Sequence, residues 1–326
     1  MKRIGNLKKM FVLAGICVFC SCSPKQVHKV TIALDNACTL EQQTIAYEVI
    51  NKRMSIWGVK GKTDLMDGKF DLTYTIGLHH NPDAGSLLTQ ILTQRGEIYI
   101  TEIYQQDEIQ SPLCSVYERL LRLMENTDRE PLWRIDDFQT ITPDLINVLL
   151  GLMENTDHEP LWRINGFQTV TPDLINVPAE QVSYIDSVFN SMQQLFPAGM
   201  SFAWTAKPNR DGFFDLLPLK NFRKLPLNPN TVKKSSFIKN YEGLQELLIE
   251  LNKEYTEEWA SMTRNNIDRS LAIVMDGKIL MYPRVQSEII GGKLVIAGNF
   301  DNNELSLIKS VIASGVLDCK TQIINQ

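Results

Sequence analysis

The reactive side chains of this sequence do not form a recognisable catalytic pattern. His79 and His80 are adjacent, and adjacent residues of a strand point to opposite faces, so this pair cannot chelate one ion without a bend. Ser, His and Asp occur singly, outside the strand–turn–helix context of a nucleophile elbow. Gly291-Gly292 is not followed by a helix, so it does not predict a phosphate-binding loop. We therefore expect no catalytic site, no metal site and no other cofactor.

Cysteine near the amino terminus predicts a different chemistry, namely lipidation. Four basic residues within positions 2–9 precede an apolar run at 10–19, which is too short to span a hydrocarbon core of about 30 Å and is typical of a secretion signal. Of the cysteines at 17, 20 and 22, only Cys22 follows a small residue. We expect cleavage after residue 21 and a lipid on Cys22. Ordinary secretion and a buried amino-terminal helix are the alternatives.

Three further cysteines remain after such a cleavage: Cys38, Cys114 and Cys319. An odd number in an oxidising compartment leaves at least one thiol free. A Cys38–Cys319 disulfide is compatible with the expected fold, because both residues fall in the same expected unit. Free buried thiols are nevertheless the favoured prediction.

Composition limits the remaining classes. The 326 residues are 44% hydrophobic and carry a formal charge of −5, which excludes intrinsic disorder and argues against a nucleic-acid-binding protein. Without residues 1–21 the chain has 29 Lys and Arg against 38 Asp and Glu, a net charge of −9. Anionic membranes repel such a body, so acyl chains would have to hold it at the cell envelope. We expect a tethered protein that faces the periplasm.

The elements expected around these residues begin with an α+β unit. Residues 28–104 show the order strand, helix, strand, strand, helix, strand, with Thr39 as a helix N-cap and Asp67-Gly68 as a hairpin turn. This order is the ferredoxin-like plan. We expect residues 22–104 to form the first part of a base subdomain.

The middle of the chain, residues 105–240, contains a tandem repeat. A segment that begins near position 121 returns 29 residues later almost unchanged, and two copies are too few for a self-stacking solenoid. We expect a mainly helical head, inserted into the base. Its aromatic residues could bind an unfolded polypeptide, although the alternative, that they form the core of the insert, is favoured. They include Trp133, Trp162, Trp204, Phe213 and Phe214.

The last segment, residues 241–326, again reads as helices and strands. A long helix is expected over 241–263, strands over 270–276 and 278–285 are joined by Asp276-Gly277, and a helix over 301–314 precedes a final strand at 316–323. We expect this segment to be the second part of the base and to join one sheet with the first part.

Residues 263–318 resemble the first periplasmic domain of the SecD protein-export family. Supporting likeness occurs at 49–59, a helix ending in Gly-Val, and at 92–103. The matching positions are turn and strand-end residues, none of them reactive. They include Asp276, Gly277, Lys278, Pro283, Gly291, Gly292 and Gly298. The resemblance implies a fold and an export pathway, and it implies no catalytic site.

The resemblance also implies limits on function. Members of that family continue into membrane helices that couple proton flow to polypeptide movement, whereas the printed sequence ends at Gln326. We therefore expect at most a binding role, toward translocated polypeptide or Sec translocon components. The alternatives are a diverged envelope scaffold for another partner and, least favoured, an envelope hydrolase.

Overall fold

The computed structural model describes only part of the chain. It comprises residues 26–35, 37–56, 60–66, 69–76, 84–105, 108, 134–135, 138–139, 168–171, 174–180, scattered positions between 182 and 196, and 198–325. These residues form a mixed structure of helices and β-sheets, as expected. Cys22, His79-His80, Cys114, Trp133, Trp162 and most of the tandem repeat lie outside the described residues.

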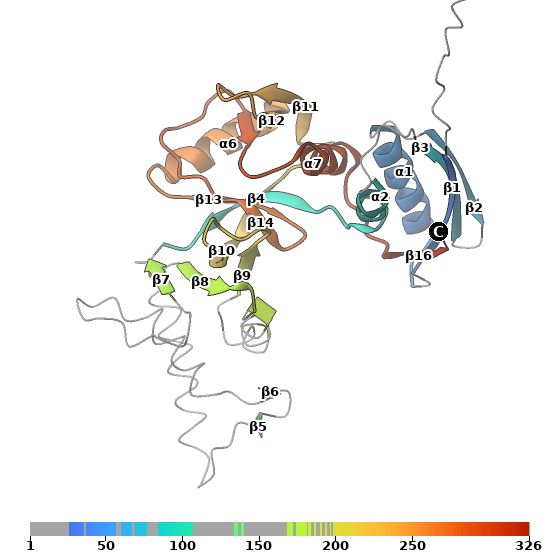
Figure 1. Ribbon diagram of the computed structural model, residues 1–326. Helices are drawn as coiled ribbons and strands as arrows, with labels where there is room; N and C mark the ends of the chain where they lie inside the picture. The colour runs from blue at the N-terminus through green and yellow to red at the C-terminus, as the bar shows by residue number, and fades with distance from the viewer. Residues whose placement is uncertain are drawn as a thin grey trace, which may run out of the picture.

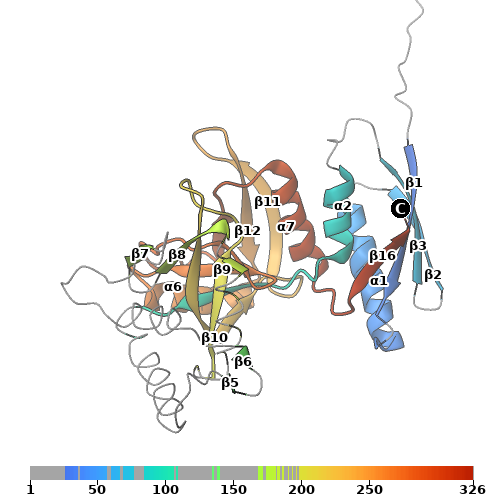
Figure 2. The same ribbon diagram turned by 60° about the horizontal axis from the view of Figure 1, so that its bottom comes forward.

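The first sheet has four strands in the order β16-β1-β3-β2, with all neighbours antiparallel. Its strands are β1 (Gln26–Leu34), β2 (Lys60–Met66), β3 (Lys69–Ile76) and β16 (Thr321–Asn325). Helices α1 (Leu40–Ile56) and α2 (Ala84–Thr93) cover one face and lie between this sheet and the remaining described chain (Figures 1 and 2). Ile32 and Leu34 of β1 are buried together with Val49, Ile50 and Leu92 of the helices.

Helix α1 begins where the sequence predicts. The Thr39 hydroxyl accepts a hydrogen bond from the Gln42 backbone N–H at 3.3 Å, and the Gln42 side chain accepts one from the Thr39 N–H at 2.8 Å. This reciprocal pair satisfies two backbone donors that a helix N-terminus would leave unpaired. The N-cap prediction for Thr39 is confirmed.

The second sheet has seven strands, five of which close on themselves. Its order is β4-β13-β14-β9-β10-β8-β7, and β4 (Ile98–Ile103) pairs with both β13 (Leu271–Met275) and β10 (Phe213–Pro226). The other members are β7 (Gln168–Thr171), β8 (Leu174–Pro178), β9 (Met200–Thr205) and β14 (Lys278–Met281). Apart from them, β5 (Arg134–Ile135) and β6 (Phe138–Gln139) form a short hairpin.

Alternate residues of the closed five-stranded ring enter two different cores. One cluster has members on all five ring strands and therefore fills the inside of the ring; it contains Tyr99, Ile103, Ala203, Leu217, Leu219, Ala272, Val274 and Ile279. The other cluster takes the opposite faces of β4 and β13, for example Ile100 and Ile273, and packs them against helices and a third sheet.

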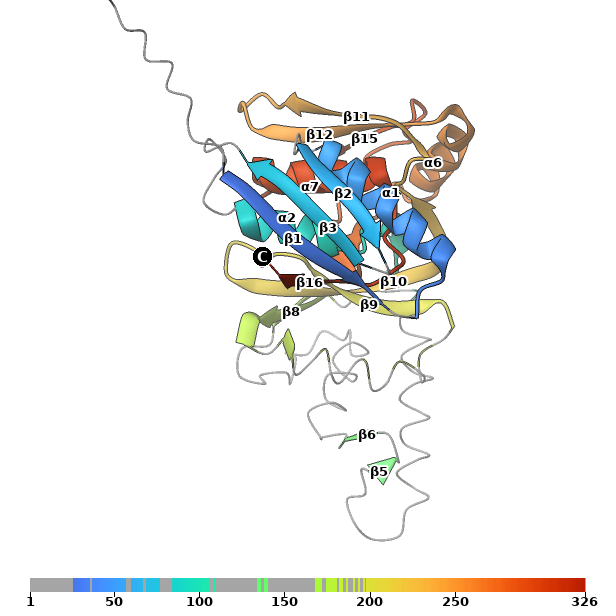
Figure 3. The same ribbon diagram turned by 90° about the vertical axis from the view of Figure 1, so that its right-hand side faces the viewer.

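The third sheet has the order β11-β12-β15. Its strands are β11 (Val232–Lys239), β12 (Gln245–Leu251) and β15 (Lys293–Ile296), and it contributes Leu247, Ile249, Leu251 and Ile296 to the second core. Helices α6 (Lys253–Asn265) and α7 (Asn302–Ser314) pack into the same core (Figure 3). Asp301 caps α7 in a capping box with Glu304, in agreement with the predicted start of that helix.

Three expectations about the elements need correction. The strand expected to close the first unit is β4, and it joins the second sheet; the fourth place in the first sheet belongs to β16. The helix expected over 241–263 is β12 followed by α6, because Leu247, Ile249 and Leu251 alternate with the period of a strand. Described residues of the 105–240 segment lie mostly in strands, not helices.

The expected boundaries at 104/105 and 240/241 therefore do not coincide with the sheets. Residues 241–326 do return to the amino-terminal sheet, but only through β16, which pairs with β1 from Leu34↔Thr321 onward. The rest of that segment lies in the second and third sheets.

Candidate functional site

The turn between β13 and β14 organises the junction between the first sheet's helices and the rest of the chain. Asp276 and Gly277 both have positive φ, 49° and 78°, as a two-residue hairpin of this kind requires. The Asp276 carboxylate also accepts hydrogen bonds from the backbone N–H groups of Gly96 and Glu97, at 2.9 and 2.7 Å. One turn residue thus also fixes the connection from α2 to β4.

Arg53 of α1 is the centre of this junction. It is completely buried, and its guanidinium donates hydrogen bonds to the carbonyls of Ile91 (3.1 Å), Gln94, Arg95 (3.0 Å) and Gly315 (3.0 Å) and to the Ser314 hydroxyl (3.0 Å). These acceptors belong to the carboxyl-terminal ends of α2 and α7, where carbonyls lack helical partners and a positive charge is favourable. Arg53 therefore joins three helices.

The charge of Arg53 persists in this buried position. Burial lowers the pKa of its guanidinium to about 10, and the nearby Asp276 carboxylate opposes that shift. A pKa of about 10 leaves the side chain ionised at neutral pH. Gly96 closes over it: a Cβ there would lie 2.5 Å from an Arg53 guanidinium nitrogen and 2.6 Å from a Val311 methyl, and the φ of Gly96 is +77°.

A disulfide lies at the other end of the same unit. Cys38 and Cys319 form a disulfide, with their Cα atoms 5.9 Å apart. The bond covalently links the segment just before α1 to the segment just before β16. The preference for free thiols is therefore wrong for this pair. The pairing of Leu34 with Thr321 brings the two cysteines together, and that register is not evident in the sequence.

The other turn and strand-end residues of the SecD resemblance lie where the backbone changes direction. Pro283 follows the end of β14, as expected for a residue that leaves the ladder. Gly292 has φ +60°, and a Cβ there would lie 2.7 Å from the Thr256 hydroxyl of α6, so this position needs glycine for space as well as conformation. Gly291 and Lys278 are exposed, and Gly298 has φ +135°.

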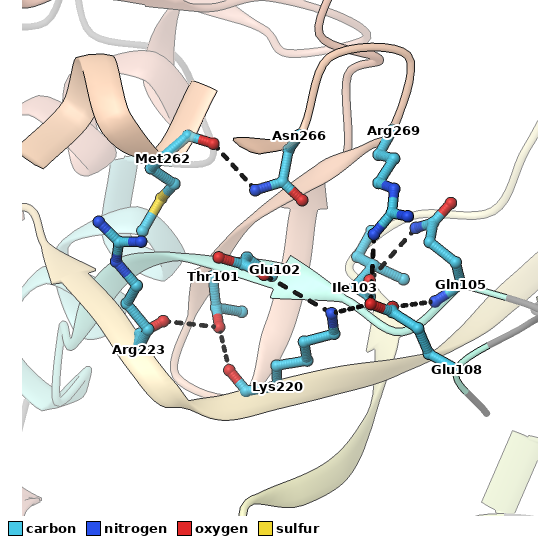
Figure 4. Close-up of polar contacts among 10 residues, drawn as sticks. All are labelled: Thr101, Glu102, Ile103, Gln105, Glu108, Lys220, Arg223, Met262, Asn266 and Arg269. Carbon is cyan, nitrogen blue, oxygen red and sulfur yellow. Dashed lines mark hydrogen bonds and ion pairs between the residues drawn. The ribbon is translucent and has the colours of Figure 1, made fainter. Parts of the chain in front are cut away.

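A second polar cluster joins β4, β10 and the loop before β13 (Figure 4). The Lys220 ammonium, with 8% of its side chain exposed, lies 2.7 Å from Glu108 and 3.6 Å from Glu102. Arg269 contacts the same Glu108 oxygen at 3.2 Å. Two cations face two carboxylates, so the cluster is electrically balanced and acts as a structural clamp on Glu108.

The electrostatics of Glu108 agree with that role. Burial disfavours its charged form, but the hydrogen bond from Lys220, the backbone N–H of Gln105 and the charges of Lys220 and Arg269 together hold the pKa of Glu108 below its usual value. Beside it, β10 carries extra residues between Lys220 and Lys224, where its register with β4 shifts.

These clusters offer no reactive centre. Within the described ranges, no group of three or more His, Cys, Asp or Glu side chains could hold a metal ion. No helix among those residues is long and apolar enough to cross a membrane.

Among the aromatic residues that could bind polypeptide, the structure describes Trp204, Phe213 and Phe214, and Trp204 fits the favoured alternative that they form a core. Trp204 is only 2% exposed and donates its indole N–H to Asp186 at 3.0 Å, so it has no surface to offer and belongs to the core. Phe213 and Phe214 are half-buried at the start of β10. Sequence reasoning missed Arg53, Lys220 and Glu108. Two signals were available for Arg53: it lies within the 49–59 resemblance, and its spacing from Val49 and Ile50 places it on the buried face of α1.

Comparisons with known proteins relate the carboxyl-terminal part of the chain to protein-export components. Residues 226–319 match the family model of the SecDF P1 head subdomain. The protein translocase subunit SecD of Leptotrichia buccalis is 31% identical over 98 residues, which are 30% of this chain and 24% of that protein. SecD of Acidaminococcus fermentans is 30% identical over 98 residues, with the same two shares. The chain thus spans about 24% of the length of these relatives.

A solved structure also aligns with most of the chain. It belongs to SecDF, described as a membrane component that enhances protein export; the alignment covers 92% of this chain and 99% of that one, with 15% identity and a TM-score of 0.47. The family match runs from the end of β10 through α7. Its description assigns the whole range to a head subdomain, whereas the sequence prediction places residues 226–240 in the head and residues 241–319 in the second part of the base. On the sequence matches, the chain contains a SecD-like first periplasmic domain.

Proposed function

We propose that this protein takes part in protein export by binding translocating polypeptide or a component of the Sec translocon, without catalysis. The observation that carries the proposal is the match of residues 226–319 to the SecDF P1 head subdomain. The named SecD relatives are translocase subunits. The charged side chains of the two clusters described above are paired with each other or with backbone carbonyls, which supports a structural role for them.

The domain organisation that we propose differs from the sequence expectation. The base consists of β1–β3, α1, α2 and β16, and its strand order with two helices on one face supports a ferredoxin-like arrangement. The head consists of the second and third sheets with α6 and α7. Arg53 and the Asp276 turn join the two subdomains.

The proposed location is the periplasmic face of the cell envelope, with a lipid on Cys22 as the tether. The basic start, the short apolar run and the small residue before Cys22 support this assignment. If the assignment is right, Cys22→Ser should abolish incorporation of labelled fatty acid into the protein. Globomycin, which inhibits cleavage of the lipid-modified precursor, should make that precursor accumulate.

One observation favours a second candidate, a scaffold that binds no unfolded chain. Trp204 is internal, as a scaffold with fully packed aromatics would require. The hydrolase alternative has no supporting observation among the described residues.

The experiment that separates the first two candidates is a binding measurement. The purified protein is titrated into a reduced, carboxymethylated model polypeptide and into its folded parent, and co-purification with Sec components is tested after crosslinking in cells. Preferential binding of the unfolded chain, or capture of Sec components, supports the export role. Failure of both refutes it.

A further inference from the structure

We propose that the outer edge of β11 binds an extended segment of polypeptide as an added antiparallel strand, with a preference for acidic side chains. This inference rests on the proposed function and names the mode by which a translocating chain would be held.

Strand β11 is the longest edge in the described sheets. It has eight residues and lies at the end of the order β11-β12-β15; the edge strands β2, β7, β15 and β16 have seven, four, four and five. Figures 1 and 3 both place it at the outer margin of the molecule. Eight residues extend over roughly 26 Å, enough for a segment of similar length to pair along it.

The backbone of β11 is paired on one side. Residues 234–239 pair in register with 245–250 of β12, and within the described chain none of them makes a backbone–backbone hydrogen bond beyond β12. An edge of this kind presents alternating N–H and C=O groups that complement any extended chain, whatever its side chains. Recognition through the backbone suits a ligand of variable sequence.

Charge selects among the chains that could occupy the edge. The strand carries three exposed lysines, Lys233, Lys234 and Lys239, and no Asp or Glu. A second copy of β11 would bring lysines against lysines, and like charges across a pair of strands are destabilising. An acidic or neutral extended segment meets no such repulsion, because flexible lysine side chains can reach acidic groups on either face of an added strand.

An apolar surface continues from the end of the edge. The 240–244 turn is held by Asn240, whose side-chain oxygen accepts hydrogen bonds from the backbone N–H groups of Glu242 (3.0 Å) and Leu244 (2.9 Å). Tyr241 is 96% exposed and Leu244 is 57% exposed. This ordered turn therefore offers apolar contact to a side chain of the segment that leaves the strand.

The test combines amide exchange with charge reversal. The probes are two eight-residue peptides, one alternating Thr and Glu and one alternating Thr and Lys, and the unfolded model polypeptide used above. Residue-resolved hydrogen exchange is measured on the purified protein with and without each probe. Binding as a strand should protect alternate amides of β11, those facing away from β12, while the amides already paired with β12 change little.

The charge arm uses two matched triple variants. Lys233→Glu/Lys234→Glu/Lys239→Glu should weaken binding of the acidic peptide about tenfold or more and reverse the preference between the two peptides. The control, Lys52→Glu/Lys253→Glu/Lys320→Glu, changes three other exposed lysines and the same total charge, and should bind like the unchanged protein.

The outcomes separate this inference from the proposed function. If the unfolded polypeptide binds but β11 amides gain no protection and the two triple variants bind alike, the edge proposal is wrong and the export role stands. If the protein binds neither peptide nor the unfolded polypeptide, the edge proposal fails; if Sec components are not captured either, the export role fails with it. Protection of β11 that grows with protein concentration in the absence of peptide would instead identify a second copy as the occupant and overturn the proposal.

Discussion

Replacement of Arg53 by methionine should destabilise the protein more than any other single change discussed here. Methionine has a side chain of similar length but no donor, so the four carbonyl groups and the Ser314 hydroxyl at the ends of α2 and α7 lose the five hydrogen bonds that Arg53 donates. A hydrogen bond to a charged group contributes about 1.5–3 kcal/mol by itself. The five are not additive, because water can enter and rehydrate some carbonyls. Removing one partner of a buried charged network typically costs about 3–5 kcal/mol, and we expect the free energy of unfolding to fall by an amount in that range.

The assay is equilibrium urea unfolding, combined with hydrogen exchange at residues 91–95 and 311–315. Arg53→Met should lower the free energy of unfolding and speed exchange at both helix ends. Arg53→Lys keeps the charge but has three donors on one nitrogen, so it should recover part of the loss. Lys52→Met is the control, since Lys52 is an exposed neighbour on α1 and should change stability by no more than about 0.5 kcal/mol. A loss below about 1 kcal/mol for Arg53→Met, or exchange unchanged at one helix end, would refute the role of Arg53 as a link among three helices.

Three other predictions concern the disulfide, a glycine and the ion cluster. Under oxidising conditions, the double variant Cys38→Ala/Cys319→Ala should have a free energy of unfolding about 2–5 kcal/mol lower than that of the unchanged protein. The difference should vanish when the unfolding of both proteins is measured in excess dithiothreitol. Gly96→Ala should cost more than about 2 kcal/mol, because the added methyl meets the buried guanidinium at 2.5 Å; Gly243→Ala, also at positive φ but with nothing within 4 Å, should cost about 1 kcal/mol in the same urea experiment. The pKa of Glu108 is lowered on folding, so its stabilising effect is complete above the unfolded-state value of about 4.3 and is lost as the pH falls through the folded-state pKa. Glu108→Gln should therefore lower stability at pH 7 and flatten the dependence of stability on pH below 5; a parallel pH profile for the two proteins would contradict this.

Local signals predicted local structure well. Thr39 caps its helix as predicted, the helix predicted to begin at Asp301 begins one residue later with Asp301 as its cap, and Asp276-Gly277 forms the expected turn. In each case the interacting groups lie within a few residues, so the sequence contains both partners in order. The return of the chain end to the first sheet was also predictable in outline, although only β16 makes it.

Contacts between residues that lie far apart in the sequence were not predictable in the same way. Thr101 is a polar residue of a strand and is nevertheless fully buried, because β4 lies between two other strands and has a core on each face. Arg53 lies three and four residues after Ile50 and Val49, on the buried face of α1, and its acceptors lie 38 to 262 positions away. The helical period indicates that this side chain is buried, but it does not show which carbonyls the guanidinium meets.

The place of β16 in the first sheet has a consequence for the order in which the protein can be made. The strand at residues 321–325 pairs with β1 at residues 31–34, and nearly the whole of the chain lies between them. Until these late residues have been synthesised, one side of β1 is unpaired and Cys38 cannot reach Cys319, whereas the strands of the closed ring can already pair. The sheet that is encoded first is thus completed only when β16 is available, and the Cys38–Cys319 disulfide can form only at that stage.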